Sequence, residues 1–177
     1  MTPTFRCLAG SLAFAALTLP SAAQAATASQ CMTKPELHGM VAYMLPFVVD
    51  SMVEKCSPTL PRDSFVASRA PQLSKELTKG QAAAWPMAKQ AFLKFGNEAD
   101  KDTRAMMDAM PESAMRPLVE SVMVQEFGGM IKTKDCKDID AILGTLVPLP
   151  ATGFVDLLTE VVVIGARDDK EMKICES

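Results

Sequence analysis

The sequence predicts an all-α protein, and three observations support this prediction. Apolar residues recur at intervals of three and four along most of the chain, which is the spacing of one face of a helix. Prolines and glycines divide the chain into segments of helical length. The alternation of apolar and polar residues that is typical of strands is not sustained anywhere. We therefore expect a compact single-domain bundle of six or seven helices over residues 26–177, with a proline-kinked first helix, a C-terminal helical hairpin and two disulfides.

Residues 1–25 are expected to be a cleaved signal peptide. A single charge at Arg6 precedes the apolar stretch 7–19, and the small residues Ala23 and Ala25 fit the pattern of signal peptidase sites. The apolar stretch is shorter than the roughly 20 residues that a membrane-spanning helix needs. We expect cleavage near Ala25, a periplasmic or secreted location, and no transmembrane segment in the mature chain.

The first helix is predicted over residues 34–55. Thr33 and Glu36 have the spacing of a capping box, in which each side chain accepts a hydrogen bond from the other residue's backbone N–H. Pro46 should kink the helix, because it removes the hydrogen bond to the carbonyl of Ala42. One apolar stripe runs along it and comprises Leu37, Met40, Val41, Met44, Val48 and Met52.

Four further helices are predicted in the middle of the chain, over residues 64–79, 81–95, about 99–109 and 111–127. Asp63 is expected to cap the first of them. Glycine commonly ends a helix, so Gly80, Gly96 and the pair Gly128 and Gly129 are expected to end the first, second and fourth of them. The residues of the last helix that should face inward are Met115, Leu118, Val119, Val122, Met123 and Phe127.

The most apolar run after the first 20 residues is Leu143 to Gly165. Two prolines interrupt this run, and Asp156 and Glu160 place charges in it, so we do not expect it to span a membrane. It predicts a short helix over residues 139–147, a proline corner, and a second helix over residues 153–166.

Asp138 and Thr152 are the expected caps of these two helices. The second helix should be a buried core helix, since its apolar residues cover most of its circumference. These residues are Phe154, Leu157, Leu158, Val161, Val162 and Ile164.

Four cysteines remain after residues 1–25, namely Cys31, Cys56, Cys136 and Cys175. An even number in an exported chain indicates disulfides, here two. Proximity in sequence favours Cys31–Cys56 together with Cys136–Cys175. Helix length favours the long-range pairings, because a 34–55 helix is roughly 33 Å long at about 1.5 Å per residue, whereas a bridge needs Cα atoms within about 7 Å. The sequence leaves the pairing open.

Methionine is unusually frequent, with 13 in the chain. Its flexible thioether fills irregular gaps in a core and also lines adaptable apolar grooves. We consider a ligand-binding groove between the first helix and the segment 106–115, with the candidate residues Met40, Met44, Met106, Met110 and Met115. Thioethers also bind Cu(I), so copper handling by the methionines of this segment, Met107 included, is an alternative.

Residues suited to catalysis are scarce. His38 is the single histidine, and we interpret it as a surface imidazole. The carboxylate pair of Asp156 and Glu160 could serve acid–base chemistry, but it is equally explained as the solvated face of a helix. Phosphate-binding loops and metal motifs are absent from the sequence. We predict no catalytic residue, no metal ligand and no cofactor, although an enzyme that uses a carboxylate pair stays a third hypothesis.

The charge of the chain argues against nucleic acid as a partner. The formal net charge is −3, and no basic cluster is accompanied by the aromatic residues that stack on bases. The leading hypothesis is therefore an exported, non-enzymatic module that binds an apolar ligand, a peptide or a protein partner.

Overall fold

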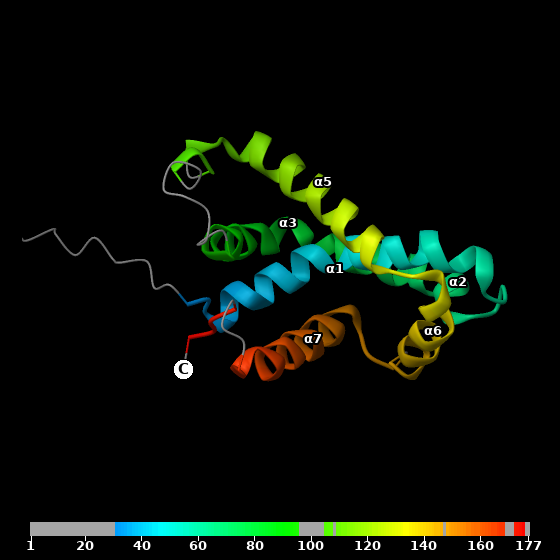
Figure 1. Cartoon of the computed structure of the whole chain (residues 1–177). Coiled ribbons are helices and arrows are strands. Elements are labelled where there is room, and N and C mark those ends of the chain that lie inside the picture. The colour runs from blue at the N-terminus through cyan, green and yellow to red at the C-terminus, as the bar shows by residue number, and fades with distance from the viewer. Residues whose placement is uncertain (1–30, 96–104, 108, 147, 169–171, 176–177) are drawn as a thin grey trace, which may run out of the picture.

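The computed structural model describes residues 31–95, 105–107, 109–146, 148–168 and 172–175. Its helices (Figure 1) are α1 Lys34–Cys56, α2 Phe65–Ser68, α3 Ala70–Phe95, α5 Glu112–Met130, α6 Cys136–Thr145 and α7 Ala151–Gly165. The β-pairing in these ranges is an isolated parallel bridge between Met32 and Ile174. The predicted all-α class is confirmed. The predicted signal peptide and most of the predicted 99–109 helix lie outside the described residues.

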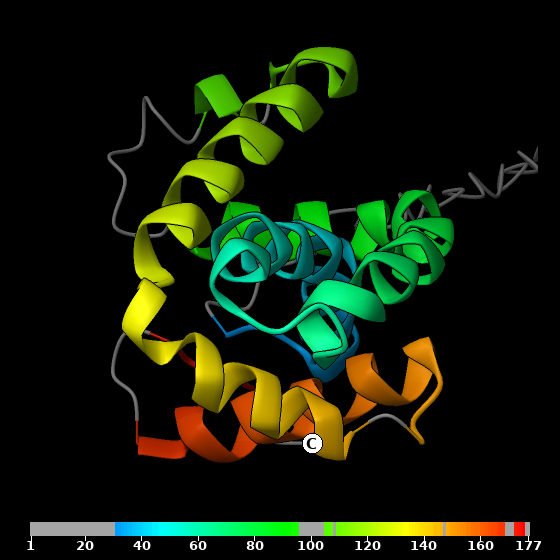
Figure 2. The same cartoon turned by 90° about the vertical axis from the view of Figure 1, so that its right-hand side faces the viewer.

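The central element is α1, which contacts α2, α3, α5, α6 and α7. Figure 2 shows it in the middle of the molecule, with α5 on one side and α7 on the opposite side. The helix begins at the predicted capping box, in which Thr33 N–H donates to Glu36 Oε2 at 2.7 Å and Thr33 Oγ1 accepts from Glu36 N–H at 3.4 Å. It continues through Pro46 without interruption. Tyr43, Leu45 and Val49 are buried although they lie off the predicted stripe.

The second long helix, α3, crosses α1 closely at Gly39. A Cβ atom at Gly39 would overlap the Cβ of Met87 and would lie 3.1 Å from the backbone nitrogen of Ala88. Ala88 and Ala91 on α3 are fully buried. Small residues on both helices therefore allow the two backbones to approach, and a larger residue at Gly39 would separate them.

Two predicted helix ends are wrong. α3 continues through Gly80, and α5 continues through Gly128 and Gly129 to Met130. Glycine inside a helix costs only about 1 kcal/mol relative to alanine. Packing of the residues on either side of Gly80, such as Leu77 and Trp85, offsets that cost.

Three predicted caps are also wrong. Ser64, not Asp63, caps α2, because Ser64 Oγ accepts from the N–H of Ala67 at 3.2 Å. Asp138 lies inside the first turn of α6, where a carboxylate is favoured by the helix dipole rather than by capping. Thr152 lies inside α7, which begins directly after Pro150.

The prediction that the last helix is a core helix is wrong. In α7 the buried residues are Phe154, Val155 and Thr159, while Val161 and Ile164 are 54% and 59% exposed. The reason is that α7 packs with one face on α1 and α3, so the opposite apolar face meets solvent. Within the described residues, no helix is long and apolar enough to cross a bilayer.

The prediction for the inward face of α5 is wrong at two of its six residues. Leu118 and Val122 are exposed, and Met115 is the buried residue of this helix. The other three residues that we expected to face inward, Val119, Met123 and Phe127, are partly buried. A single face of α5 rests on α1, so the residues on its flanks are left in contact with solvent.

Both disulfides join distant parts of the chain. Cys31 is bonded to Cys175 and Cys56 to Cys136, with Cα atoms 5.0 and 5.3 Å apart. The first bridge is reinforced by backbone hydrogen bonds, since the N–H of Met32 donates to Lys173 and the N–H of Cys175 donates to Met32. A local Cys31–Cys56 bridge does not occur because α1 is one continuous helix. Each end of α1 is instead tied to the C-terminal part of the chain.

Candidate ligand-binding groove

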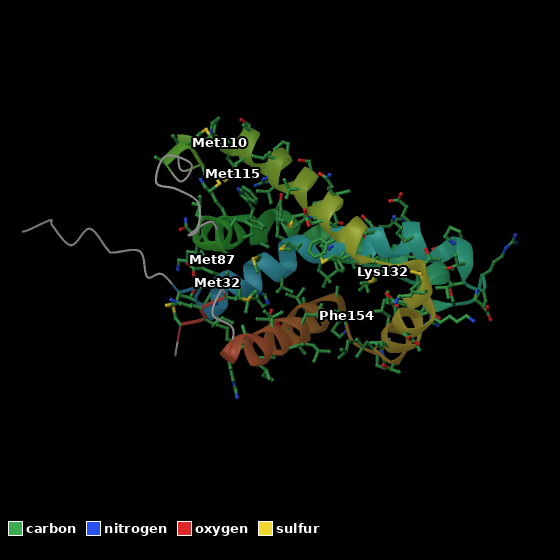
Figure 3. All side chains as sticks on the ribbon, viewed as in Figure 1. Met32, Met87, Met110, Met115, Lys132 and Phe154 are labelled. Carbon is green, nitrogen blue, oxygen red and sulfur yellow. A yellow bond between two sulfur atoms is a disulfide. The ribbon has the colours of Figure 1, made fainter. Side chains whose placement is uncertain are left out.

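The structure distributes the predicted methionine site over two apolar clusters. Met40 is buried and Met44 packs beside it, together with residues of α3 and α7. Met115, Met107 and Met110 pack around Tyr43 and Trp85 in another cluster. Figure 3 shows Met110 and Met115 near the start of α5. Met106 is 61% exposed.

A groove of about 780 Å³ lies between α1, α3 and α7, and none of these methionines is among the residues that line it. Its α3 wall is formed by residues spaced three and four apart, which places them on one face of the helix. These residues are Glu76, Leu77, Gly80, Ala83, Ala84 and Met87. The α1 wall includes His38, Gly39 and Ala42, and the α7 wall consists of Ala151, Thr152, Val155 and Asp156.

The groove exists because the residues between the three helices are small. Ala42 on α1 and Ala83 and Ala84 on α3 are among the lining residues, so little side-chain volume fills the space between the helices. Val155 of α7 is buried and lies at the same groove. Binding sites for small molecules have volumes of about 300 to 1,000 Å³ and mostly apolar walls, and this groove has both properties.

Two polar pairs lie at the rim of the groove. His38 Nε2 lies 3.1 Å from Asp156 Oδ1 and links α1 to α7. Lys79 donates to Glu76 at 2.5 Å on α3. The hydrogen bond from Lys79 holds the pKa of Glu76 below its usual value. A ligand in the groove would therefore meet an apolar surface bordered by oriented polar groups.

A polar network on the far side of α1 attaches α5. The hydroxyl of Tyr43 donates to Glu120 Oε1 at 2.7 Å, and the guanidinium of Arg116 lies 4.9 Å from the centre of the Trp85 ring. Burial, together with the hydrogen bond to Glu120, raises the pKa of Tyr43 well above its usual value. These contacts hold α5 against α1 and α3, and we assign them a structural role.

A partly buried ion pair fastens the start of α1 to the end of α3. Lys94 Nζ donates to Glu36 Oε2 at 2.7 Å and to the carbonyl of Cys31 at 3.0 Å. Burial alone would raise the pKa of Glu36, but the hydrogen bonds from Lys94 and Thr33 outweigh burial and lower it. The described residues contain no group of three or more His, Cys, Asp or Glu side chains placed to hold a metal ion.

Sequence reasoning missed nearly all the residues of the groove. His38 was expected to be a surface imidazole, and it is exposed as expected, but it is paired with a residue 118 positions away. The glycine and alanines of the walls carry no chemical signal of their own. The spacing of Gly80, Ala83, Ala84 and Met87 was visible in the sequence, although it was interrupted by the helix end that we expected at Gly80.

The fold and the groove together define an all-α, disulfide-linked helical domain with an open apolar groove. A comparison with models of known protein families found no match. Comparisons with curated proteins and with solved structures found none either. The function must therefore be argued from the groove itself.

Proposed function

We propose that the protein is an exported, non-enzymatic binding module that holds an apolar small molecule in the groove between α1, α3 and α7. The observation that carries this proposal is the groove of about 780 Å³, lined mostly by alanine, glycine, leucine, methionine, proline and valine residues. The two disulfides support a location outside the reducing cytosol, where such bridges form and persist.

The driving force for binding would be the removal of apolar surface from water. Each square ångström buried contributes about 25 cal/mol. The wall residues offer few side-chain rotamers that must be ordered, because alanine and glycine have none to lose. The groove would therefore bind with little cost of rearrangement.

The frame around the groove supports the same proposal. α1 and α3 are in close contact at Gly39, and a disulfide holds each end of α1. The two helices that form most of the wall are thus fixed before a ligand arrives. A preformed site favours a small molecule over a partner that must reshape the surface.

The decisive test is to fill the groove with a side chain. Ala83 and Ala82 are adjacent exposed residues of α3, but only Ala83 lines the groove. We expect Ala83→Phe to weaken binding of an uncharged apolar fluorescent probe by about tenfold, equivalent to about 1.4 kcal/mol. The matched control Ala82→Phe should bind the probe as the unsubstituted protein does.

Two results would contradict the proposal. One is a probe that binds equally well to Ala83→Phe and Ala82→Phe, which would place binding elsewhere. The other is the absence of any probe binding to the unsubstituted protein, combined with native mass spectra that contain no ligand. Circular dichroism on both variants would establish that the helical fold is retained.

A further inference from the structure

The polar pair of His38 and Asp156 gives the groove a defined hydrogen-bonding character. His38 Nε2 lies 3.1 Å from Asp156 Oδ1, and both residues line the groove. An ionised carboxylate can only accept hydrogen bonds. When Asp156 is ionised, the hydrogen between these atoms is therefore carried by Nε2 of His38.

This assignment determines the role of the other ring nitrogen. In a neutral imidazole, one nitrogen donates and the other accepts. With Nε2 as the donor of a neutral ring, Nδ1 of His38 keeps its lone pair and is the acceptor. Among the described residues, Asp156 is the partner of the His38 ring, and Nδ1 has none.

The charged groups around the groove indicate which ligand would suit this acceptor. The carboxylates of Asp156 and Glu76 lie at the rim and would repel an anionic head group. Lys79 is engaged with Glu76, and Lys34 pairs with Glu160 one turn along from His38 and Asp156. The same carboxylates would attract an ammonium group, but ion pairs at an exposed rim contribute little, and an ammonium group loses more hydration than a hydroxyl on entering an apolar groove.

We propose that the ligand is an apolar molecule with a hydroxyl group, and that this hydroxyl donates to Nδ1 of His38. This inference rests on the proposed function and names the chemical class of its ligand. Asp156 acts as a positioning residue, because it fixes the tautomer in which Nδ1 accepts.

Two isomeric probes isolate the hydrogen bond. Decanol and nonyl methyl ether contain the same atoms, but only decanol has an O–H group. One hydrogen bond contributes about 0.5 to 1.5 kcal/mol net, and His38 is half exposed, so we expect decanol to bind about threefold more tightly. Displacement of the apolar fluorescent probe by each isomer measures this ratio, and decanoate and decylamine should bind more weakly than decanol.

Substitutions at the pair should remove the preference. In His38→Phe, which keeps a ring but has no acceptor, the two isomers should bind equally. Asp156→Asn should reduce the preference, because an amide no longer fixes the tautomer. Glu160→Gln is the matched control on the same helix, since Glu160 does not line the groove, and it should keep the full preference for decanol.

The tautomer can also be observed directly. His38 is the single histidine of the chain, so the imidazole ¹⁵N resonances have only one possible assignment. We expect the Nε2–H tautomer, and a shift of the Nδ1 resonance with decanol that nonyl methyl ether does not produce. An Nδ1–H tautomer, equal binding of the two isomers, or a preference for decanoate or decylamine would overturn this inference.

The outcomes separate the inference from the function on which it rests. If both isomers bind equally and Ala83→Phe blocks both, the groove binds apolar molecules and only the choice of hydroxyl is wrong. If neither isomer binds and no apolar probe binds, the proposed function itself fails.

Discussion

α7 is more apolar than α1 in sequence, but α1 is the more buried helix in the structure. α7 is the more apolar of the two helices, with apolar residues on nearly all sides, yet only Phe154, Val155 and Thr159 are buried. α1 carries more polar residues but has buried residues along its whole length, from Leu37 to Cys56. Burial is decided by the number of neighbouring helices, and α1 has α3, α5 and α7 around it.

The difference between the two helices shows that hydrophobicity alone does not predict burial. A continuous apolar run indicates that a helix can be buried, but not that the chain supplies enough partners to cover it. α7 has partners on one face, so Leu157, Val161 and Ile164 form an exposed stripe with the spacing of one helical face. Polar residues of α1 are accommodated because they form caps and ion pairs, as Glu36 does with Lys94.

The largest expected effect compares leucines of the two helices. Leu37 of α1 is fully buried and Leu157 of α7 is 38% exposed. Leu37→Ala should lower the free energy of unfolding by about 2 to 5 kcal/mol, because it leaves a cavity in the core. Leu157→Ala should lower it by less than about 1 kcal/mol.

Urea unfolding followed by the fluorescence of Trp85, the single tryptophan, measures both leucine variants. Equal losses would show that α7 is covered in solution by something that is not part of this chain's fold. They would therefore remove the contrast between the two helices.

Smaller changes in stability, of opposite sign, are expected when two glycines are replaced by alanine. Gly39→Ala should destabilise the protein by about 1 to 3 kcal/mol, because its methyl group would collide with Met87 at the crossing of α1 and α3. Gly80→Ala should stabilise it by about 0.5 to 1 kcal/mol, since a Cβ at Gly80 meets nothing within 4 Å and alanine favours the helix. Thermal unfolding of the two variants tests the signs, and a gain in stability for Gly39→Ala would refute the close crossing.

The smallest expected effect concerns Tyr43 of α1 at alkaline pH. Its pKa is raised in the folded protein by burial and by Glu120, so the folded state holds the phenolic proton more firmly than the unfolded chain does. The stability that this contributes is fully present below about pH 10, where free tyrosine ionises, and is lost as the pH rises further.

The absorbance of tyrosinate provides the measurement for Tyr43, because it is the single tyrosine in the chain. We expect its ionisation to coincide with alkaline unfolding observed by circular dichroism. Ionisation near pH 10 in a protein that is still folded would contradict the buried hydrogen bond to Glu120. In Glu120→Gln, tyrosinate should form at a lower pH than in the unsubstituted protein, since the negative charge that opposes ionisation is removed.

The parts of the fold that depend on local pattern could be predicted from the sequence. The capping box of Thr33 and Glu36 and the all-α class depend on residues three or four positions apart, whereas the predicted stripe of α1 matches the buried residues only at Leu37 and Met40. Helix ends were less predictable, because packing around Leu77 and Trp85 carries α3 through Gly80. Propensity at one glycine is a smaller term than the burial of the residues on either side.

The groove could not be predicted, because it consists of contacts between distant segments. Its walls come from three helices, and small residues such as Ala83 and Gly39 acquire meaning only when the helices are placed together. The pairing of His38 with Asp156 has no local signature. The methionines stand out in the sequence. The methionine that lines the groove is Met87, which is not among the candidate residues predicted from the sequence.

The bond between Cys31 and Cys175 brings both ends of the folded body within 5.0 Å, measured between Cα atoms. A tensile load applied to the two chain ends would pass through this covalent link and would largely bypass the helices between them. The body would thus be mechanically shielded for as long as the bridge is oxidised. Reduction would transfer the load to α1 and to the backbone pairing of Met32 with the C-terminal tail.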